Sequence, residues 1–329
     1  AGARRSGRPL LFLGGGLVLL LAIGGASLVY GAVNLTFSEA WSGLTSESDA
    51  FARGVVWQIR YPRFIDGALV GACLAVAGAL LQGVTRNPLA DPTIVGVTAA
   101  AGLASAIALV IDPQIAQWAL AMTCVVGGIA GAGILFFIAW RGMVSPVRLA
   151  LSGVALSAFF GAAIVALLSS SRTFLQTSLG FLAGGLYGAE WNEMHAMLPY
   201  AIPGLLAGLL LAGRLNVLAL GDDVAAGLGV LTDRTRLAVL AVCGVLTGAA
   251  VSASGLVSFV GLVCPHLARF SIGPDNRWVI PLSALYGAIL VTGADLAARI
   301  VIAPSEIPMG IITAGIGAPF LLYLVKFRG

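Results

Sequence analysis

Charged side chains are scarce in this sequence. Acidic and basic residues together make up 10% of its 329 residues, against about 25% in an ordinary soluble domain. Hydrophobic residues make up 59%, and the mean hydropathy is +1.01. A water-soluble fold needs polar side chains over most of its surface, so this composition argues against a soluble enzyme, a nucleic-acid-binding protein and a disordered chain. It predicts a protein whose surface faces lipid.

Lysine, histidine and cysteine are also rare. The single lysine, Lys326, is followed by Phe327, so the phosphate-binding motif G-x-x-x-x-G-K-[ST] is missing and this chain does not hydrolyse ATP through such a loop. The two histidines are distant in sequence and form no metal-binding pattern. The four cysteines lie in apolar stretches without C-x-x-C spacing, and we interpret them as small buried hydrophobic residues. We therefore expect no catalytic residue, resident metal or cofactor.

Long stretches without charge divide the chain into candidate membrane spans. A bilayer core needs about 20 apolar helical residues. Only helices or closed barrels satisfy the backbone in lipid, and continuous apolar windows predict helices. The charge-free windows are 9–38, 67–85, 92–111, 113–140, 149–171, 194–213, 237–268, 278–294 and 307–325, with 173–189 as a further candidate. The first follows Arg4, Arg5 and Arg8 as in a signal peptide, but it exceeds the usual apolar core of about 7–15 residues, so we interpret it as a retained span.

The distribution of basic residues between the two sides of the membrane distinguishes two possible topologies. Window 237–268 is too long for one span and short for two, and residues 252–255 (Ser-Ala-Ser-Gly) interrupt its middle. If this window forms two spans, 13 basic residues lie on the cytoplasmic side and 5 on the outer side. If it forms one span, 10 lie on the cytoplasmic side and 8 on the outer side. Because Lys and Arg concentrate on the cytoplasmic side, we predict an all-α polytopic membrane protein with ten transmembrane helices and cytoplasmic N- and C-termini.

The whole of 1–329 then forms a single transmembrane domain. A loop at 214–236 is expected in the cytoplasm, and a helix at 173–193 is expected to lie along the periplasmic surface. Glycine is abundant, with 44 residues, and pairs of the small-x-x-x-small type predict close helix contacts. These pairs are Gly67/Gly71, Gly127/Gly131, Gly204/Gly208 and Gly244/Gly248.

Polar residues near the predicted outer side form two groups. Arg60 and Arg63 lie outside, against the usual bias, just before a span. They are either interfacial anchors or a docking site for an acidic partner, because guanidinium groups pair bidentately with carboxylates. Asp295 is the only acidic residue that we place within a span, and Arg299 follows four residues later on the same helix face, which predicts a local ion pair.

Two inner segments also stand out. Residues 82–92 contain two prolines and an asparagine between two spans, so they form either a tight loop or irregular backbone that lines a cavity. In 220–229, Gly221, Asp222 and Asp223 suit the start of a helix, and Gly227 and Gly229 suit its end. A short helix there is either a connector or an element that fits a groove on a partner.

Taken in order, these segments resemble the FecCD-type permeases, the membrane subunits of ATP-driven importers for iron-siderophores, haem and cobalamin. The resemblance covers nearly the whole chain. It is carried by residues 60–63, 87–92, 221–229, 259–269, 294–299, 306–310 and 317–320.

The resemblance implies a homodimer in the bacterial inner (cytoplasmic) membrane with a central pathway, two copies of a separate ABC ATPase inside, and a periplasmic substrate-binding protein outside. ATP would be hydrolysed on the partner chain, so this chain is expected not to be an enzyme and not to bind nucleic acid. Arg60, Arg63 and Arg299 match the arginines that pair with glutamates of the binding protein. The ATPase coupling region is matched by Gly221, Asp222, Asp223, Ala225, Ala226, Gly227, Leu228 and Gly229.

Pathway positions and substrate are expected from the same resemblance. Asn87 and Leu89 match the loop that helps close the inner end of the pathway. Pro146 and Val147 stand where the cobalamin branch carries adjacent hydroxyl residues. The chain resembles the haem-importing branch most, so haem is the expected substrate, with an iron-siderophore or cobalamin importer as the alternative.

Arg172 follows the fifth predicted span on the outer side. It is either an interfacial anchor or, with its copy in a dimer, a group that attracts the propionates of haem. A passive channel or scaffold that binds no ATPase is the competing hypothesis from another class.

Overall fold

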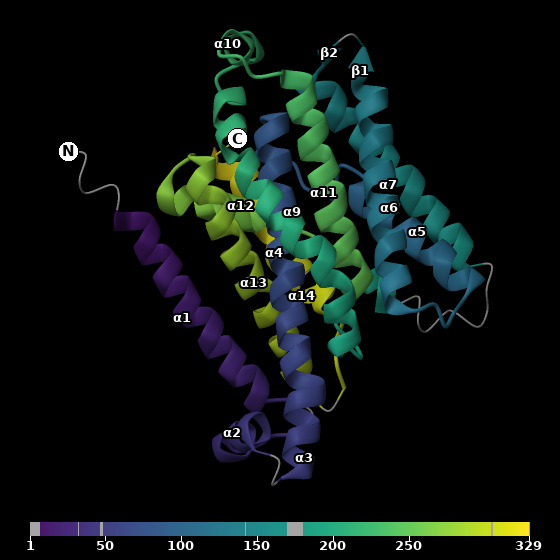
Figure 1. Ribbon diagram of the computed structural model, residues 1–329, viewed down its shortest axis with the longest axis vertical. Helices are drawn as coiled ribbons and strands as arrows, with labels where there is room; N and C mark the ends of the chain where they lie inside the picture. The colour runs from purple at the N-terminus through teal and green to yellow at the C-terminus, as the bar shows by residue number, and fades with distance from the viewer. Residues whose placement is uncertain are drawn as a thin grey trace.

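The computed structural model of the chain describes residues 7–31, 33–46, 49–141, 143–169, 180–303 and 305–328. Figure 1 shows long helices bundled along the long axis, with α10 and the β1–β2 hairpin at one end and α2 and α3 at the other. We refer to these as the α10 end and the α3 end. The elements are α1 (Gly7–Val29), α2 (Phe37–Thr45), α3 (Ala50–Arg53), a π-helical turn η1 (Gly54–Arg60), α4 (Tyr61–Thr85), α5 (Val97–Ile111), α6 (Gln117–Ala139), β1 (Trp140–Arg141), β2 (Met143–Val144), α7 (Pro146–Ser169), α9 (Trp191–Leu218), α10 (Asp222–Gly227), α11 (Thr232–Ser254), α12 (Val260–Ile272), α13 (Asn276–Ile300) and α14 (Met309–Arg328).

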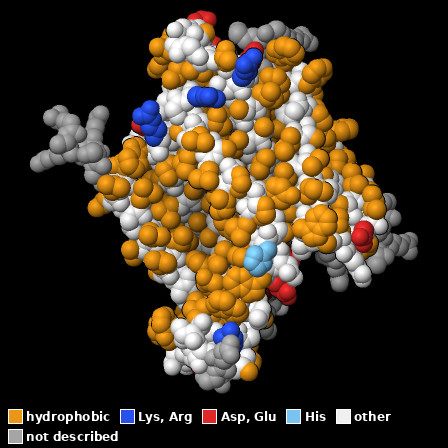
Figure 2. Space-filling view, in the orientation of Figure 1, with side chains coloured by type: hydrophobic (Ala, Val, Ile, Leu, Met, Phe, Trp, Pro, Cys, Tyr) orange, Lys and Arg blue, Asp and Glu red, His pale blue; other side chains and the backbone are white. Residues whose placement is uncertain are grey.

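Among the described residues, the regular secondary structure is helical apart from the two-residue strands of the hairpin. Seven of its helical segments are long and apolar enough to cross a membrane, and α5, α12 and α14 are shorter apolar helices. Apolar side chains cover the broad middle of the face in Figure 2, while basic side chains on that face lie mostly toward the α10 end. The prediction of an all-helical polytopic membrane protein agrees with this surface.

The break predicted in window 237–268 is present. Helix α11 ends at Ser254, and Gly255 takes a positive φ of 65° that favours glycine. A short connection follows, and α12 begins after Phe259, which has a φ of 69°. The backbone amide of Leu256 donates to the carbonyl of Phe181 at 3.0 Å. The connection is therefore held by protein groups, the condition under which irregular backbone is tolerated at membrane depth.

The predicted span 92–111 is helical only from Val97 onward. Asp91, directly before this window, delays the start of the helix, because its carboxylate accepts a hydrogen bond from the Thr93 amide at 2.8 Å and so stabilises a turn. Gly96, with a φ of 85°, then begins the helix.

The predicted surface helix at 173–193 is only partly described, because residues 173–179 lie outside the described residues. Residues 180–183 are helical, 184–190 are not, and Trp191 begins α9. The amide of Gly185 donates to the carbonyl of Ser254 at 2.9 Å, and the amide of Gly310 donates to the carbonyl of Gly184 at 3.1 Å. This segment thus joins the end of α11 to the start of α14.

Helix α4 lies at the centre of the bundle and contacts α9, α11, α12 and α13. Its close approach to α13 depends on glycine, because a Cβ on Gly71 would overlap the carbonyl group of Gly287. The four glycine pairs predicted from the sequence all lie at helix contacts. All four cysteines are buried, with 0–1% of their surface exposed, as predicted.

We expect Gly71→Ala to destabilise the chain by about 1–3 kcal/mol, because the added methyl group forces α4 and α13 apart. Gly14→Ala is the matched control, since nothing lies within 4 Å of its added Cβ on α1. The measurement is thermal unfolding of the detergent-solubilised chain. Equal unfolding temperatures for the two variants would contradict the packing role of Gly71.

Candidate functional site

The three arginines predicted as docking residues lie together at the α3 end. Arg60, Arg63 and Arg299 line one cavity of about 180 Å³, together with Glu306. They come from two regions that are distant in sequence: the junction of η1 and α4, which carries Arg60 and Arg63, and the end of α13, which carries Arg299. Each arginine is at most 8% exposed. The structure therefore brings the three arginines together, but it places them beneath the surface rather than on it.

Arg63 is the centre of an ion-pair network. Its Nε and Nη2 donate to Oδ1 of Asp295 at 3.0 and 2.8 Å. Its Nη1 and Nη2 also donate to Oε1 and Oε2 of Glu306, at 3.2 and 2.8 Å. The other oxygen of Asp295, Oδ2, lies 3.1 Å from Nε of Arg299, so the ion pair predicted between these residues is present. One guanidinium thus connects α4 to α13 and to the segment before α14.

Arg60 has a different set of partners. Its guanidinium donates to the carbonyls of Leu28 at 2.6 Å and Val29 at 3.0 Å, and also to the carbonyl of Val33. These contacts provide hydrogen-bond donors to carbonyls at and after the end of α1, but they bring no negative charge to balance Arg60. Three cations therefore face two carboxylates, and the cluster has an excess positive charge that favours one further anion.

Glu306 belongs to this cluster and was not selected from the sequence. It was quoted only within a family motif, although an acidic residue directly before the last apolar window was a usable signal. Its side chain is 23% exposed, and it lines both the arginine cavity and a neighbouring cavity of about 760 Å³. That neighbouring cavity lies beside α5, α6 and the end of α11, and the hydroxyl-bearing residues Ser105, Ser252 and Ser254 contribute to its lining.

Asp66 corrects the prediction that Asp295 is the only acidic residue within a span. The sequence window was drawn from residue 67, but α4 begins at Tyr61 and carries Asp66 inside it. Asp66 is 0% exposed, and neither carboxylate oxygen has a hydrogen-bond partner among the described residues. Asp66 is therefore a fully buried acidic residue within a span, which the charge-free windows did not include.

At the α10 end, Asp222 is held by two arginines. Arg236 donates through Nη2 to both carboxylate oxygens at 2.9 Å, and Arg86 also donates to Oδ1. Arg86 additionally donates through Nε to the carbonyl of Leu218 at 2.9 Å. Partial burial acts to raise the pKa of Asp222, but the hydrogen bonds and charges of Arg236 and Arg86 outweigh it and hold the pKa below its ordinary value. We call these three side chains the α10 clamp.

The short helix predicted at 221–229 is present as α10. Gly221 and Gly229 flank it with positive φ angles of 115° and 80°. Ala225 is fully buried, whereas Val224 and Leu228 are 49% and 62% exposed and lie four residues apart, on one face. The helix therefore has a buried contact with the bundle and an apolar outer face.

The other predicted pathway residues belong to neither the arginine cluster nor the α10 clamp. Asn87 and Leu89 form a turn after α4, in which Oδ1 of Asn87 accepts from the Leu89 amide at 3.0 Å. Pro146 and Val147 begin α7, and Val147 is 67% exposed. Arg172 lies outside the described residues. The structure neither joins these positions into one site nor tests their role.

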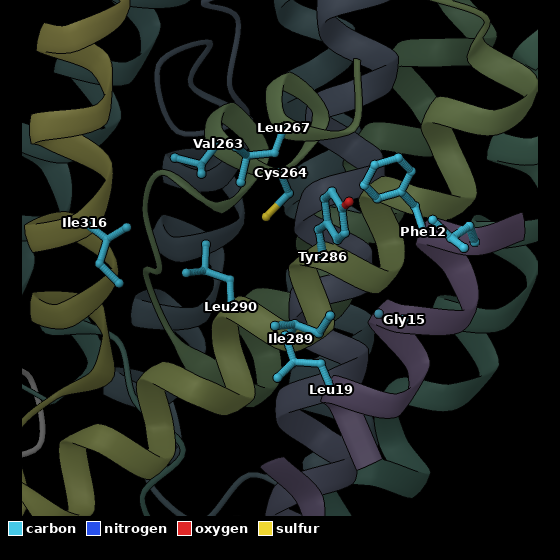
Figure 3. Close-up of a pocket in the computed structure, with 12 residues that line it drawn as sticks. Phe12, Gly15, Leu19, Val263, Cys264, Leu267, Tyr286, Ile289, Leu290 and Ile316 are labelled. Carbon is cyan, nitrogen blue, oxygen red and sulfur yellow. The ribbon is translucent and has the colours of Figure 1, made fainter. Parts of the chain in front are cut away.

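An apolar cavity of about 670 Å³ lies between α1, α12, α13 and α14. Figure 3 shows Phe12 and Leu19 on one side and Ile316 on the other, with Tyr286 and Leu290 between them. None of its lining residues is charged, so it offers no ion pair to a polar substrate.

The two histidines lie among aromatic side chains. His195 of α9 stacks near Trp191, with ring centroids 6.1 Å apart. His266 of α12 meets Phe270 edge-on at 4.5 Å. Among the described residues, no group of three or more His, Cys, Asp or Glu side chains is placed to hold a metal ion.

Comparisons with known proteins match almost the whole chain. A family model described as the FecCD transport family matches residues 18–327. The chain is 39% identical over 315 residues to the iron(3+)-hydroxamate import system permease protein FhuB of Bacillus subtilis, covering 94% of this chain and 82% of the relative. It is 38% identical over 327 residues to the hemin transport system permease protein HmuU of Yersinia pestis, covering 97% and 96%.

A third relative and a solved structure extend the likeness. The chain is 41% identical over 278 residues to the cobalamin import system permease protein BtuC of Halobacterium salinarum, covering 84% of this chain and 74% of the relative. It superposes with a TM-score of 0.84 and 29% identity on a metal-chelate type ABC transporter in an inward-facing conformation, covering 97% and 99% of the two chains.

We expect Asp222→Asn to loosen α10 at neutral pH, because the substitution removes the charge that both arginines bind. Hydrogen exchange should accelerate several-fold at the amides of Ala225, Leu228 and Val230, whose hydrogen bonds close this turn. Asp223→Asn is the control, since it removes the same charge from the same turn at an exposed position. Equal exchange in the two variants would contradict the clamp.

The same interaction predicts a pH dependence. Because the folded pKa of Asp222 lies below its unfolded value, the clamp contributes stability above the unfolded pKa of about 3.9 and loses it as the pH falls through the folded pKa. In the wild-type chain, protection of α10 should therefore fall below about pH 4. In Asp222→Asn, this acid-dependent loss should be absent.

Proposed function

Because the chain belongs to the FecCD transport family, we propose that it is the membrane-spanning permease subunit of an ATP-driven importer. The observation that carries the proposal is the family match over residues 18–327. Two structural features support it: the arginine cluster at the α3 end and the α10 clamp at the opposite end. Such a subunit transports and leaves ATP hydrolysis to a separate ATPase chain, which agrees with the missing phosphate-binding motif.

We propose ten crossings, with the α10 end and both termini in the cytoplasm of a bacterial inner membrane. The seven long segments supply seven crossings, and α5, α12 and α14 supply the other three. At 1.5 Å per residue, the 15 residues of α5 and the 13 residues of α12 are too short for a core of about 30 Å. The irregular residues 91–96 and 255–259, which lie within the bundle, complete those crossings.

Aromatic residues support a membrane interface at the α3 end, and basic residues support the orientation. Trp57, Tyr61 and Trp191 cluster at the α3 end, with ring centroids 5.3–5.7 Å apart, as in the aromatic belt of a membrane interface. The basic residues of the α10 clamp and its surroundings lie at the opposite end, which is the distribution expected of a cytoplasmic side.

The ATPase is proposed to bind α10. The exposed side chains of Val224 and Leu228 form the apolar face that would enter a groove on the partner. The α10 clamp ties this face to the end of α4 through Arg86 and to α11 through Arg236. A displacement of α10 would therefore reach two central spans directly. ATP shifts the population between outward-open and inward-open states only by its differential affinity for them.

The substrate-binding protein is proposed to dock at the arginine cluster. Its carboxylate would meet the excess positive charge near Arg60, but Glu306 already occupies Arg63 in a bidentate contact. Docking at Arg63 therefore requires an exchange of one carboxylate for another. Glu306 precedes α14, so this exchange would release the segment that leads into the last crossing.

A homodimer is proposed from the family and from the lateral surface. Along α7 the large apolar side chains of Leu151, Val154, Phe159 and Val165 are 55–68% exposed. Lipid or a second copy of the chain must cover such a face. The pathway would lie between the two copies, as the family implies.

Haem is the proposed substrate, with a ferric siderophore or cobalamin as the alternative. The hemin permease relative aligns over 97% of this chain and 96% of its own length, which supports this choice. The hydroxamate and cobalamin relatives have similar identities, so the test compares the three cargo classes directly.

We expect ATP-dependent uptake of haem by proteoliposomes that contain the chain, its ATPase and its binding protein. Ferric hydroxamate and cobalamin are the comparison substrates. Arg172→Ala should lower haem uptake several-fold, because the guanidinium attracts propionates. Uptake without ATP would support the passive channel, and uptake of only another cargo would overturn haem while leaving the importer assignment intact.

Glu306→Gln should increase the affinity of the binding protein about five- to tenfold, because Arg63 no longer has to exchange a charged partner. The measurement is equilibrium binding to the chain in nanodiscs at low salt. Asp112→Asn makes the same charge change in the exposed α5–α6 turn, where asparagine can still accept from the Gln114 amide. An affinity no higher than that of Asp112→Asn would contradict the exchange.

A further inference from the structure

A second charged cavity lies at the α10 end. It is separate from the arginine cluster, and of the α10 clamp it includes Arg86 but neither Asp222 nor Arg236. Its volume is about 350 Å³, and it is formed by the end of α4, the end of α9, α12 and the start of α13. Arg86, His266 and Arg269 line it, and no acidic residue does. Since one water occupies about 30 Å³ of liquid, the cavity has room for a tetrahedral anion with several waters.

Arg269 is the principal charge of this cavity. Its Nη1 donates to Oε1 of Gln82, and no acidic residue in the described part of the chain forms an ion pair with it. Gln82 is 3% exposed and is held in place because its Nε2 donates to the carbonyls of Gly261 at 3.2 Å and Leu262 at 3.4 Å. A neutral amide oxygen therefore faces a guanidinium that has five N–H groups and a permanent charge. A partly buried charge in this position favours a counter-ion.

The acids nearby are already engaged. Asp222 belongs to the α10 clamp and is shared between Arg86 and Arg236. Asp275, which begins α13, accepts from Nδ2 of Asn216 at 2.6 Å and from the amide of Arg277 at 3.0 Å. Neither acid lines the cavity.

The cavity lining also includes one hydrogen-bond acceptor without a donor, the side-chain oxygen of Asn276. Asn276 is 4% exposed, its amide Nδ2 donates to Asn216, and its Oδ1 has no hydrogen-bond partner among the described residues. The cavity thus presents cationic donors together with one buried acceptor that lacks a donor. A carboxylate satisfies only the donors, whereas hydrogen phosphate accepts from guanidinium groups and donates through its P–OH.

We propose that this cavity binds a phosphate group, supplied either by free phosphate or by the headgroup of phosphatidylglycerol, whose glycerol hydroxyl provides the same donor. The bound anion links Arg269 on α12 to Arg86 at the end of α4. Because Arg86 also holds Asp222, the occupied site ties α12 to the α10 clamp. This assignment does not depend on the ATPase or on the transported substrate.

The test uses the full-length chain. Its thermal unfolding is followed in detergent as inorganic phosphate is titrated against chloride at constant ionic strength. A second arm compares nanodiscs of phosphatidylglycerol with nanodiscs of phosphatidylcholine. The variants are Arg269→Gln and Gln82→Glu, and the control is Arg277→Gln, an exposed arginine at the start of α13 that does not line the cavity.

The wild-type chain and Arg277→Gln should show a saturable rise in unfolding temperature, with phosphate, with phosphatidylglycerol or with both. Arg269→Gln should bind at least tenfold more weakly. Gln82→Glu should also abolish the rise in unfolding temperature, because its carboxylate supplies the counter-charge of Arg269 from within the chain. If Arg269→Gln does not fold, Gln82→Glu alone tests whether the cavity binds phosphate. A response to phosphate alone identifies the free ion, and a response to phosphatidylglycerol alone identifies the lipid headgroup. No saturable rise in either arm, or an undiminished rise in Arg269→Gln and Gln82→Glu, would overturn the proposal.

Discussion

A charge buried among these helices must find its partner within the protein, because lipid offers none. Seven charged residues meet this constraint in two small networks, one at each end of the bundle. Arg63 bridges Asp295 and Glu306 at one end, and Asp222 bridges Arg86 and Arg236 at the other. Each network joins segments that are far apart in sequence. The ion pairs that compensate buried charge are therefore also contacts that connect distant segments of the bundle.

Much of the fold follows from the distribution of apolar residues along the chain. The all-helical architecture, the break after Ser254 and the short helix α10 agree with local signals in the sequence: charge-free length, small polar residues and glycine. The predicted glycine pairs lie at helix contacts for a similar local reason, because small residues allow helices such as α4 and α13 to approach closely. The shortened α5 was not predicted, because the turn at Asp91 depends on a side-chain hydrogen bond that hydropathy does not register.

The site was less accessible to sequence reasoning. Arg60, Arg63 and Arg299 were selected as a group, and they do lie together. Their burial, and the bidentate contact with Glu306, are tertiary facts that no spacing along the chain encodes. Asp66 was missed because a window drawn between charges places every charge at a window edge. The partners of Asp222 come from the ends of α4 and α11, so only packing of the bundle brings them together.

The burial of all four thiols makes the native chain a ready background for site-directed labelling. Water-soluble maleimides should leave Cys73, Cys124, Cys243 and Cys264 unmodified while the bundle is intact, because reaction needs an accessible thiolate. A single cysteine introduced beside α10 or in the segment before α14 would then be the principal reactive position. Fluorophores or spin labels placed there would report the relative motion of the two ends during turnover, without first removing native residues from the core.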